Sequence, residues 1–475
     1  MLALSLHLAI VTGFTLRILL RDELAPTTRL AWFMVIVVLP VFGSVIYFLF
    51  GEVNLGRTQT DRISEVSREF RAHRDLLPGR SDDWAAQVPP AYRAAFAYSA
   101  SINGFPPVCA NAAELMPDAA TTRARMIADI DAAQDHVHVL YYIWLDDETG
   151  SAMARALIRA ARRGVTCRAM ADGLGSRAFI RSRLWAEMRD AGVQVAVALP
   201  IGNPLTTILK SRLDLRNHRK ITIIDGKTTW CGSQNCADPE FRVKAKFAPW
   251  IDIMVRVEGP VVAQNQLLFA SDWVAHCGGS IEDFPISPAR HEPGFVAQLM
   301  GDGPTERTLA TPHLFAALMY TAQSDVVIST PYFVPNSLVL EAICAAAYRD
   351  VRVRMIFPRR NDSWIVAAAS QSSYRQLLES GVEIFEHREG LLHAKTITID
   401  GQVALIGSSN LDLRSFDLNY ESNLLLSDAG LTGAIAARQA QYIAGSDRVG
   451  LAHVDAWPPY RRVWNNVIAT IGPVL

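Results

Sequence analysis

Two long apolar segments open the chain. Residues 1–16 contain no Lys, Arg, Asp or Glu, and Leu30 to Phe50 forms a second run of 21 residues without a charge. About 20 apolar residues in a helix match the roughly 30 Å hydrocarbon core of a bilayer. A short polar segment, Arg21 to Arg29, joins the two runs. The pattern therefore predicts an N-terminal two-helix transmembrane hairpin in residues 1–51.

A signal peptide followed by a buried helix is the alternative interpretation. Signal peptides begin with positive charge and end at a small-residue cleavage site, and neither feature is clear here. A hairpin places both of its ends on one side of the membrane, and an excess of Lys and Arg marks the cytoplasmic side. The loop offers only Arg17, Arg21 and Arg29, whereas the segment after the second run carries Arg57, Arg62, Arg68, Arg71 and Arg74. We therefore expect the rest of the chain on the cytoplasmic face.

Helical and strand patterns then alternate, and their order occurs twice. The first set places helices at 124–130, 150–163 and 182–191 and strands at 137–144, 165–170 and 193–198. The second set places helices at 314–322, 337–348 and 364–380 and strands at 326–333, 351–357 and 382–385. Such alternation predicts βαβ units and a largely parallel sheet.

The repeat decides the expected architecture. It predicts two α/β halves, residues 106–290 and 291–475, related by a pseudo-twofold axis, with the strand ends meeting at one central cleft. Residues 52–105, which contain several Gly and Pro residues, are predicted to be a polar linker that enters the first half.

Composition limits the classes of function. Hydrophobic residues make up 50% of the chain and charged residues 20%, and the formal net charge is −1. This balance gives no general electrostatic case for binding nucleic acid, so any anion site must be local. The six cysteines form no CxxC pair and no zinc-finger spacing, so we predict no metal site and no cofactor.

One set of polar residues follows the last predicted strand of each half. Both copies have the spacing His-x-Lys-x4-Asp-x6-Gly-Ser-x-Asn: His218, Lys220, Asp225, Ser233 and Asn235 in the first, and His393, Lys395, Asp400, Ser408 and Asn410 in the second. Two chance occurrences of six fixed positions are very improbable. A catalytically inactive duplicate is the more serious alternative, but both copies keep every candidate reacting residue.

The spacing has a physical interpretation. His and Lys two positions apart on a strand point to the same face, and an Asp-Gly pair favours a tight hairpin turn. The returning strand then brings Gly-Ser-x-Asn beside His-x-Lys. Imidazole, ammonium, hydroxyl and amide groups together suit the non-bridging oxygens of a phosphoryl group. We therefore predict that the two Ser and two Asn residues bind phosphate. Asp225 and Asp400 are counted with the His and Lys residues as candidate catalytic residues of the motif, although their place at turns makes them look more structural than catalytic.

Two histidines are what a two-step displacement at phosphorus requires. One attacks as the neutral imidazole, and the other donates a proton to the leaving oxygen and later deprotonates the acceptor. Lys220 and Lys395 supply positive charge. A carboxylate should orient each imidazole, and Asp252 and Glu421 are the candidates; the alternative for each is an ordinary surface carboxylate.

With these motifs the chain resembles the phospholipase D superfamily, and it is most similar to bacterial cardiolipin synthases. The resemblance includes Leu39-Pro40, residues 47–51, 141–143 and 330–335, and most specifically residues 410–416 with 419–421. The aliphatic stretch 423–426 departs from the aromatic strand of many members, which leaves the lipid preference in doubt. The resemblance implies two phospholipase-D-type halves in the membrane-anchored chain of an inner-membrane, multi-pass enzyme.

The resemblance also implies a reaction. One phosphatidylglycerol gives its phosphatidyl group to a histidine, and a second accepts it, which forms cardiolipin and releases glycerol. It implies that His218 is the nucleophile and His393 the acid and base, although the nearly symmetric motifs do not separate these roles. Phosphatidylethanolamine could replace one phosphatidylglycerol. The expected partners are phospholipid and the bilayer, with no nucleic acid, and a homo-oligomer is left open.

Other functions stay as alternatives. A phospholipase D or another phosphodiesterase would transfer the same intermediate to water, and the near-zero net charge and the two spans disfavour a nuclease. A non-enzymatic membrane protein is disfavoured by the two intact motifs. Residues 201–215, which mix Leu205, Ile208 and Leu209 with basic residues, either dip into anionic headgroups or form a surface loop.

Overall fold

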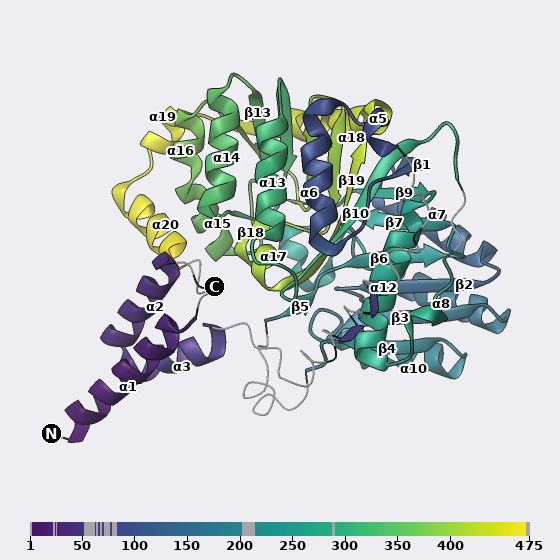
Figure 1. The fold of residues 1–475 in the computed structure, drawn as a ribbon, viewed down its shortest axis with the longest axis horizontal. Helices are drawn as coiled ribbons and strands as arrows, with labels where there is room; N and C mark the ends of the chain where they lie inside the picture. The colour runs from purple at the N-terminus through teal and green to yellow at the C-terminus, as the bar shows by residue number, and fades with distance from the viewer. Residues whose placement is uncertain are drawn as a thin grey trace.

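A single mixed sheet of sixteen strands runs through the molecule (Figure 1). The computed structural model describes residues 2–21, 24, 26–51, 62, 65–66, 69–70, 77, 83–201, 214–286 and 290–471. The first half contributes β1 (Val108–Leu115), β2 (His136–Tyr141), β3 (Thr166–Asp172), β4 (Gln194–Ala198), β6 (Lys220–Ile224), β7 (Thr228–Gly232) and β9 (Met254–Glu258). Their order in the sheet is β1-β9-β7-β6-β2-β3-β4.

The second half repeats this order with its own strands. They are β10 (Phe295–Asp302), β11 (Asp325–Ser329), β13 (Arg352–Pro358), β14 (Glu383–His387), β16 (Thr396–Ile399), β17 (Val403–Gly407), β19 (Asn419–Ser427) and β20 (Ser446–Val449). The order is β10-β19-β17-β16-β11-β13-β14, followed by β20 at the edge. Because β1 pairs with β10 in antiparallel fashion, the two halves share one sheet, and the equivalent strand orders on either side confirm the predicted repeat.

The prediction of a largely parallel sheet is wrong for most of the strands. Only β2-β3-β4 and β11-β13-β14 pair in parallel among the strands of this shared order. The motif strands β6–β7 and β16–β17 are antiparallel hairpins, since a two-residue turn can join only antiparallel neighbours. The Asp-Gly turn residues indicated antiparallel pairing of the motif strands, whereas the alternation of helices and strands did not.

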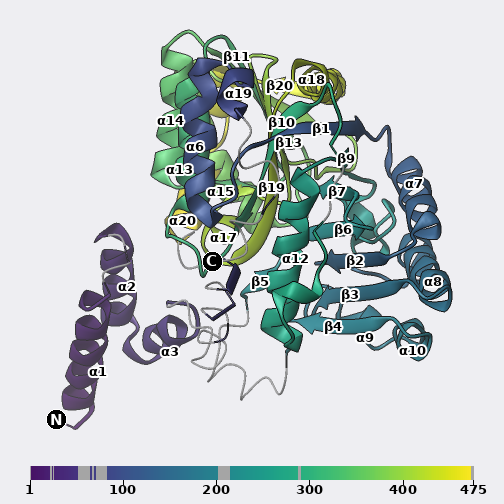
Figure 2. The same cartoon turned by 45° about the vertical axis from the view of Figure 1, so that its right-hand side comes forward.

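Helices cover both faces of the strands in each half (Figure 2). In the first half, α7 (Ala119–Ala132), α8 (Glu148–Arg162), α9 (Arg177–Ile180) and α10 (Arg183–Asp190) pack on one face and α12 (Val261–Cys277) on the other. In the second half, α13 (Ala310–Thr321), α14 (Ser337–Tyr348) and α16 (Tyr374–Glu379) lie opposite α18 (Ala429–Ala444). The side chains of Asp118, Asp147, Asn336 and Asp428 accept backbone N–H groups at the starts of α7, α8, α14 and α18, as N-caps do.

Further elements complete the described chain. Within the predicted linker, α5 (Trp84–Gln87), a 3-10 turn (Pro90–Tyr92) and α6 (Arg93–Asn103) occur, and α6 buries Ala95 and Phe96 against the core of the second half. The predicted helix at 364–380 is divided into α15 (Trp364–Ser372) and α16. The chain continues through α17 (Leu413–Asp417), α19 (Leu451–Asp455) and α20 (Pro459–Ile471). Residues 202–213, which include most of the predicted interfacial segment, lie outside the described residues.

Three helices rather than two form the N-terminal region. They are α1 (Leu2–Leu19), α2 (Pro26–Val38) and α3 (Pro40–Phe50), which pack around Trp32 and Tyr47. The second predicted span is interrupted at Leu39 because Pro40 has no N–H to donate and starts a new helix. Among the helices that the structure describes, none combines the length and apolarity needed to cross a membrane.

The two motif aspartates lie at the hairpin turns, as predicted. Asp225 and Gly226 have φ of 52° and 61°, and Asp400 and Gly401 have φ of 51° and 65°, which is the left-handed conformation that Asp-Gly favours. The Asp225 carboxylate accepts the backbone N–H groups of residues 134–136 at the start of β2. Asp400 does the same for residues 323–325 before and in β11. Each carboxylate therefore ties a motif hairpin to the neighbouring strand.

Replacing Asp225 with Gly should destabilise the protein by about 2 kcal/mol, because the backbone N–H groups of residues 134–136 would lose a charged acceptor. Glycine tolerates the positive φ, so the change isolates the carboxylate. The free energy of unfolding is measured by urea denaturation in detergent. Asp131→Ala, which removes an exposed ion pair with Arg159, is the control and should cost less than about 1 kcal/mol. Equal losses in the two variants would contradict the prediction.

Candidate active site between the two halves

His218 is held beside a carboxylate from the other half of the chain. It directly follows β5 (Arg216–Asn217), which pairs in parallel with the start of β19. The backbone N–H of His218 donates to the carbonyl of Tyr420 at 2.9 Å. This register places Glu421 next to the imidazole, and Nδ1 of His218 lies 3.0 and 2.9 Å from the two carboxylate oxygens.

His393 has the reciprocal arrangement. It follows β15 (Leu391–Leu392), which pairs in parallel with β8 (Trp250–Ile251) of the first half. The backbone N–H of His393 donates to the carbonyl of Ile251 at 2.8 Å, and Nδ1 lies 2.6 Å from Oδ1 of Asp252. Asp252 and Glu421 therefore contact the histidines as expected of orienting groups, and each does so across the boundary between the halves, which the sequence pattern did not reveal.

The motif serines have partners that differ from the predicted phosphate. The Ser233 hydroxyl donates to Oδ1 of Asp252 at 2.6 Å and accepts the N–H of Ile253 at 3.1 Å. The Ser408 hydroxyl donates to Glu421 and accepts the N–H of Ser422 at 2.8 Å. Each serine thus fixes the carboxylate that orients a histidine, so its hydroxyl hydrogen is already used.

The two lysines lie on the same side of their strands as the histidines. Nζ of Lys220 donates to the carbonyl of His218 at 2.6 Å, and Nζ of Lys395 donates to the carbonyl of His393 at 2.7 Å. Burial lowers the pKa of Lys220 to about 8. Burial, with repulsion from Lys220, lowers the pKa of Lys395 to about 7. The ammonium groups are therefore strong hydrogen-bond donors that are poorly solvated.

Both imidazoles are neutral at pH 7. They are only 8% and 3% exposed, and burial lowers the pKa of each to about 4. Burial alone would raise the pKa of Asp252, but His393 and Lys395 outweigh it and hold this pKa at about 2. The pKa of Glu421 is likewise lowered by His218 and Lys220, against the effect of burial. Because both carboxylates are ionised, Nδ1 must carry the imidazole hydrogen, which leaves the Nε2 lone pair free.

The charged groups of the two motifs belong to one site. Lys395 of the second motif lowers the pKa of His218, and Lys220 of the first motif lowers that of His393. Burial lowers the pKa of both lysines, and Glu421 and Asp252, one from each half, act against it by raising the pKa of both. In the described part of the chain, no cluster of three or more His, Cys, Asp or Glu side chains could hold a metal ion. The positive charge near the histidines comes from the lysines.

The two motif asparagines are placed differently. Oδ1 of Asn235 accepts the N–H of Ile143 at 3.3 Å. Nδ2 of Asn410 donates to the Ser415 hydroxyl at 3.3 Å, and its buried Oδ1 has no partner. These contacts hold both amides beside the Gly-Ser-x-Asn turns.

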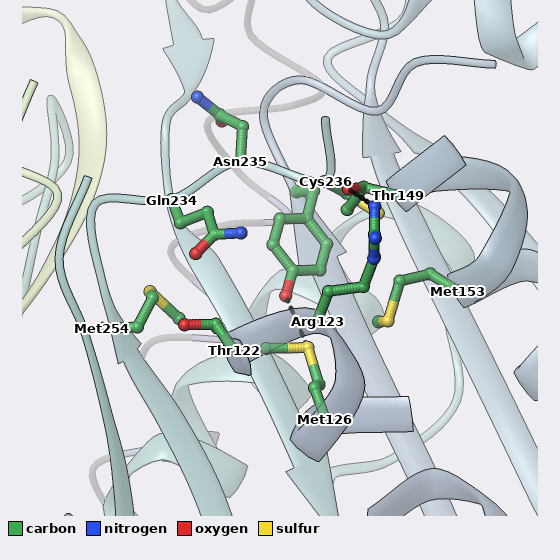
Figure 3. Close-up of a pocket in the computed structure, with 10 residues that line it drawn as sticks. Thr122, Arg123, Met126, Thr149, Met153, Gln234, Asn235, Cys236 and Met254 are labelled. Atoms are coloured by element: carbon green, nitrogen blue, oxygen red, sulfur yellow. Dashed lines mark hydrogen bonds between the residues drawn. The ribbon is translucent and has the colours of Figure 1, made fainter. Parts of the chain in front are cut away.

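A small cavity lies behind the first Gly-Ser-x-Asn turn (Figure 3). Met126, Met153 and Gln234 are among its lining residues, and the side chain of Asn235 points away from its centre. Its volume is about 10 Å³, which is at most room for one water molecule. It is therefore a packing void and not a substrate cleft.

Sequence reasoning missed several residues that support the site. The ring of Tyr142 lies edge-on to that of His218, with ring centroids 4.9 Å apart. The ring centroids of Trp250 and His393 are 4.5 Å apart. Arg219, between the motif His and Lys, is buried; it donates to both oxygens of Asp272 at 2.7 Å and to the carbonyl of Glu421 at 3.0 Å. Ala394 is at the equivalent position of the second motif. For Arg219 the sequence did offer a signal, because an arginine in one motif stands where the other motif has an alanine.

The sequence is similar to those of known proteins over nearly its full length. A family described as "Cardiolipin synthase, PLD-like domain" matches residues 126–273 and 315–443, and one described as "Phospholipase D-nuclease N-terminal" matches residues 9–52. Cardiolipin synthase A of Serratia proteamaculans is 36% identical over 471 residues, which cover 98% of this chain and 96% of that protein. Cardiolipin synthase A of Pectobacterium carotovorum is 34% identical over 478 residues, with the same coverage.

The fold also has a relative among solved structures. The crystal structure of phosphatidylserine synthase from Haemophilus influenzae superposes with a TM-score of 0.57 at 16% sequence identity. The match covers 76% of this chain and 95% of that one. At this identity the likeness shows a shared fold, with two phospholipase-D-like halves in a mixed α/β arrangement.

The lowered lysine pKas predict how anion binding depends on pH. Raising the pH from about 6 to about 9 should weaken the binding of sulfate to the site, because first Lys395 and then Lys220 lose their charge. Proton uptake by a histidine on anion binding acts in the same direction. Sulfate keeps its charge in this range, and its affinity is measured by isothermal titration calorimetry, which does not require an active enzyme. Lys395→Met should remove the step near pH 7, whereas an affinity that is constant across the range would contradict the prediction.

Glu421→Gln should lower turnover by about 100-fold or more, because a neutral amide no longer stabilises the imidazolium or sets its tautomer. Glutamine has the same shape but only one acceptor oxygen, so it can keep the hydrogen bond of Ser408 or that of Asn419, which donate to different oxygens of Glu421. Turnover and thermal unfolding are measured on the same preparation. Asp131→Asn, far from the site on α7, is the control and should retain activity. Wild-type turnover in the Glu421 variant would contradict the orienting role.

Proposed function

The chain belongs to the cardiolipin synthase family of phospholipase-D-like proteins, and we propose that it joins two phosphatidylglycerol molecules into cardiolipin and glycerol. One observation carries the proposal: two neutral histidines, each hydrogen-bonded to a carboxylate of the other half, face one site. The similarity to cardiolipin synthases over 98% of the chain supports lipid transfer in particular.

In the first step His218 is the nucleophile. Its Nε2 attacks phosphorus of one phosphatidylglycerol, so a P–N bond forms as the P–O bond to the glycerol headgroup breaks. The imidazolium of His393 gives its proton to the departing glycerol oxygen. Glu421 accepts the Nδ1–H of His218 and stabilises the positive charge that the phosphorylated imidazole acquires. We assign the nucleophile to His218 by the resemblance to the superfamily.

In the second step the proton moves back. Neutral His393 removes the proton from a glycerol hydroxyl of the second phosphatidylglycerol, and that oxygen attacks phosphorus. The P–N bond breaks, which frees His218 and leaves His393 protonated for the next cycle. No net oxidation or proton release occurs, since one phosphodiester replaces another.

The charge balance explains how His393 becomes an acid although burial lowers its pKa to about 4. With both lysines charged, two ammonium groups, two carboxylates and two neutral imidazoles sum to zero. A bound phosphodiester adds one negative charge to a buried site, and uptake of one proton restores neutrality. The substrate itself thus supports the protonation that its leaving group requires.

Lys220, Lys395, Asn235 and Asn410 are the proposed phosphate-binding side chains, and Asp225 and Asp400 hold the motif hairpins. Ser233 and Ser408, which are bonded to Asp252 and Glu421, act as positioning residues in this scheme. The change from the expected role follows from those hydrogen bonds.

A diacyl lipid substrate requires a site close to a bilayer, because each CH₂ withdrawn costs about 0.8 kcal/mol. We propose that residues 1–51 attach the protein to the inner membrane as a multi-pass anchor and that residues 52–105 connect it to halves 106–290 and 291–475 on the cytoplasmic face. The match of residues 9–52 to an N-terminal family supports the separate role of this region.

An ester with a good leaving group separates the two histidine roles. A short-chain phosphatidyl-p-nitrophenol needs no proton donor, so His393→Ala should release a burst of nitrophenol and retain a phosphatidyl adduct on His218. His218→Ala should give neither. Peptide mass spectrometry locates the adduct, and an adduct on His393 in the His218 variant would reverse the assignment.

Labelled phosphatidylglycerol then tests the product: cardiolipin with glycerol is expected, whereas phosphatidic acid alone would indicate hydrolysis.

A further inference from the structure

The last helix of the chain has an exposed apolar face. Tyr460, Val463, Trp464 and Val467 recur at positions i, i+3, i+4 and i+7 of α20, which places them on one side of the helix. Between 49% and 76% of each residue is exposed to solvent. Trp364, at the start of α15, is 63% exposed and stacks on Trp464 with ring centroids 5.8 Å apart. We call these five residues the α20 face.

Such a concentration is unusual for the rest of the surface. Outside residues 1–51, the described part of the chain has eleven exposed large hydrophobic residues, and five of them form the α20 face. A stacked tryptophan pair that remains in water loses the stabilisation that burial of each ring would bring. Contiguous exposed apolar surface of this kind marks an interaction site.

The opposite side of α20 packs on the second half of the protein. Asn465 and Ile468 are buried, and Ile468 packs against Ala368, Ala369 and Val334. Val334 belongs to β12 (Phe333–Val334), which pairs in parallel with β18 (Leu411–Asp412). Since β18 directly follows Asn410 of the second motif, the α20 face is joined to the candidate site through two short strands.

The charge on α20 indicates the chemistry of its partner. Pro459 to Ile471 contains Arg461 and Arg462 and no acidic residue. The Arg461 guanidinium lies 4.3 Å from the centre of the Trp457 ring, and Arg462 is exposed. An apolar face with aromatic residues, bordered by arginine, is typical of helices that lie in the interface of an anionic bilayer.

We propose that the α20 face docks on the headgroup region of an anionic lipid bilayer and holds the second half of the enzyme against the membrane. The proposal rests on the proposed function, because the substrate lies in that bilayer. In both views α20 lies on the side of the molecule that carries α1–α3 (Figures 1 and 2). Those helices also expose apolar side chains, among them Met34, Phe42 and Val45. One lipid surface could therefore contact both ends of the chain.

Fluorescence quenching tests the docking directly on the full-length protein. Cys277 is the exposed cysteine among the described residues, so Cys277→Ser provides the background for a single label. An environment-sensitive fluorophore on Val467→Cys should be quenched several-fold more strongly by brominated acyl chains in phosphatidylglycerol vesicles than the same label on Tyr348→Cys. Tyr348 is the matched control because it is an exposed aromatic residue on α14.

Equal quenching at the two positions would overturn the proposal. A signal at Val467→Cys that depends on protein concentration in detergent, and not on lipid, would assign the face to a second copy of the chain and would also overturn it. Quenching that occurs only at Val467→Cys and only with lipid is the expected result.

An activity measurement separates this proposal from the proposed function. Trp464→Ser combined with Val463→Ser should lower turnover of phosphatidylglycerol in vesicles several-fold and leave turnover of dissolved short-chain phosphatidylglycerol unchanged. Tyr320→Ser combined with Tyr348→Ser, which also removes exposed aromatic rings, should change neither. Equal turnover of vesicles by wild type and the α20 variant would overturn the docking role. A wild type that makes no cardiolipin from either substrate would refute the proposed function, while the quenching result still decides whether α20 binds lipid.

Discussion

The site depends on two histidine–carboxylate contacts. In each one, a motif histidine is hydrogen-bonded to a carboxylate of the other half. Neither half contains both members of a pair: His218 needs Glu421, and His393 needs Asp252. Each bond sets the tautomer of a neutral imidazole and directs its Nε2 lone pair into the site. Because the carboxylates are buried beside two lysines, removal of any one charge would leave the others uncompensated. The halves are thus coupled by chemistry as well as by packing.

The shared sheet makes this coupling possible. Pairing of β1 with β10 joins the halves along their centre, and the short parallel pairs β5–β19 and β8–β15 set the register that brings each histidine beside its carboxylate. The motif serines then fix the carboxylates. Arg219 of the first motif, which has no counterpart in the second, adds hydrogen bonds to Asp272 and to the carbonyl of Glu421. The duplicated motifs therefore have equal reacting groups and unequal supports, which is the structural basis on which two identical side chains can have different roles.

The sequence allowed much of this to be predicted, and the errors have physical causes. The Asp-Gly turns and the His-x-Lys alternation depend on local geometry, so the hairpins and the structural role of Asp225 and Asp400 were predictable. The partner of each histidine depends on how strands 203 and 141 residues apart come together, which no local pattern encodes. The serines were assigned to phosphate because their proximity to Asp252 and Glu421 is likewise a property of the fold. Pro40 shows the reverse case: apolarity suggested one uninterrupted helix over Leu30 to Phe50, although the proline itself indicated the break.

The separation of the paired residues along the chain has a consequence for biosynthesis. Glu421 lies 203 residues after His218, and His393 lies 141 residues after Asp252. At roughly 5–20 residues per second, a ribosome needs about 10 s or more to make the carboxylate that His218 requires. Throughout that interval the first motif is complete in sequence but has no orienting partner. The nascent chain is consequently inert toward the lipids around it, and its chemistry begins only when synthesis is nearly finished.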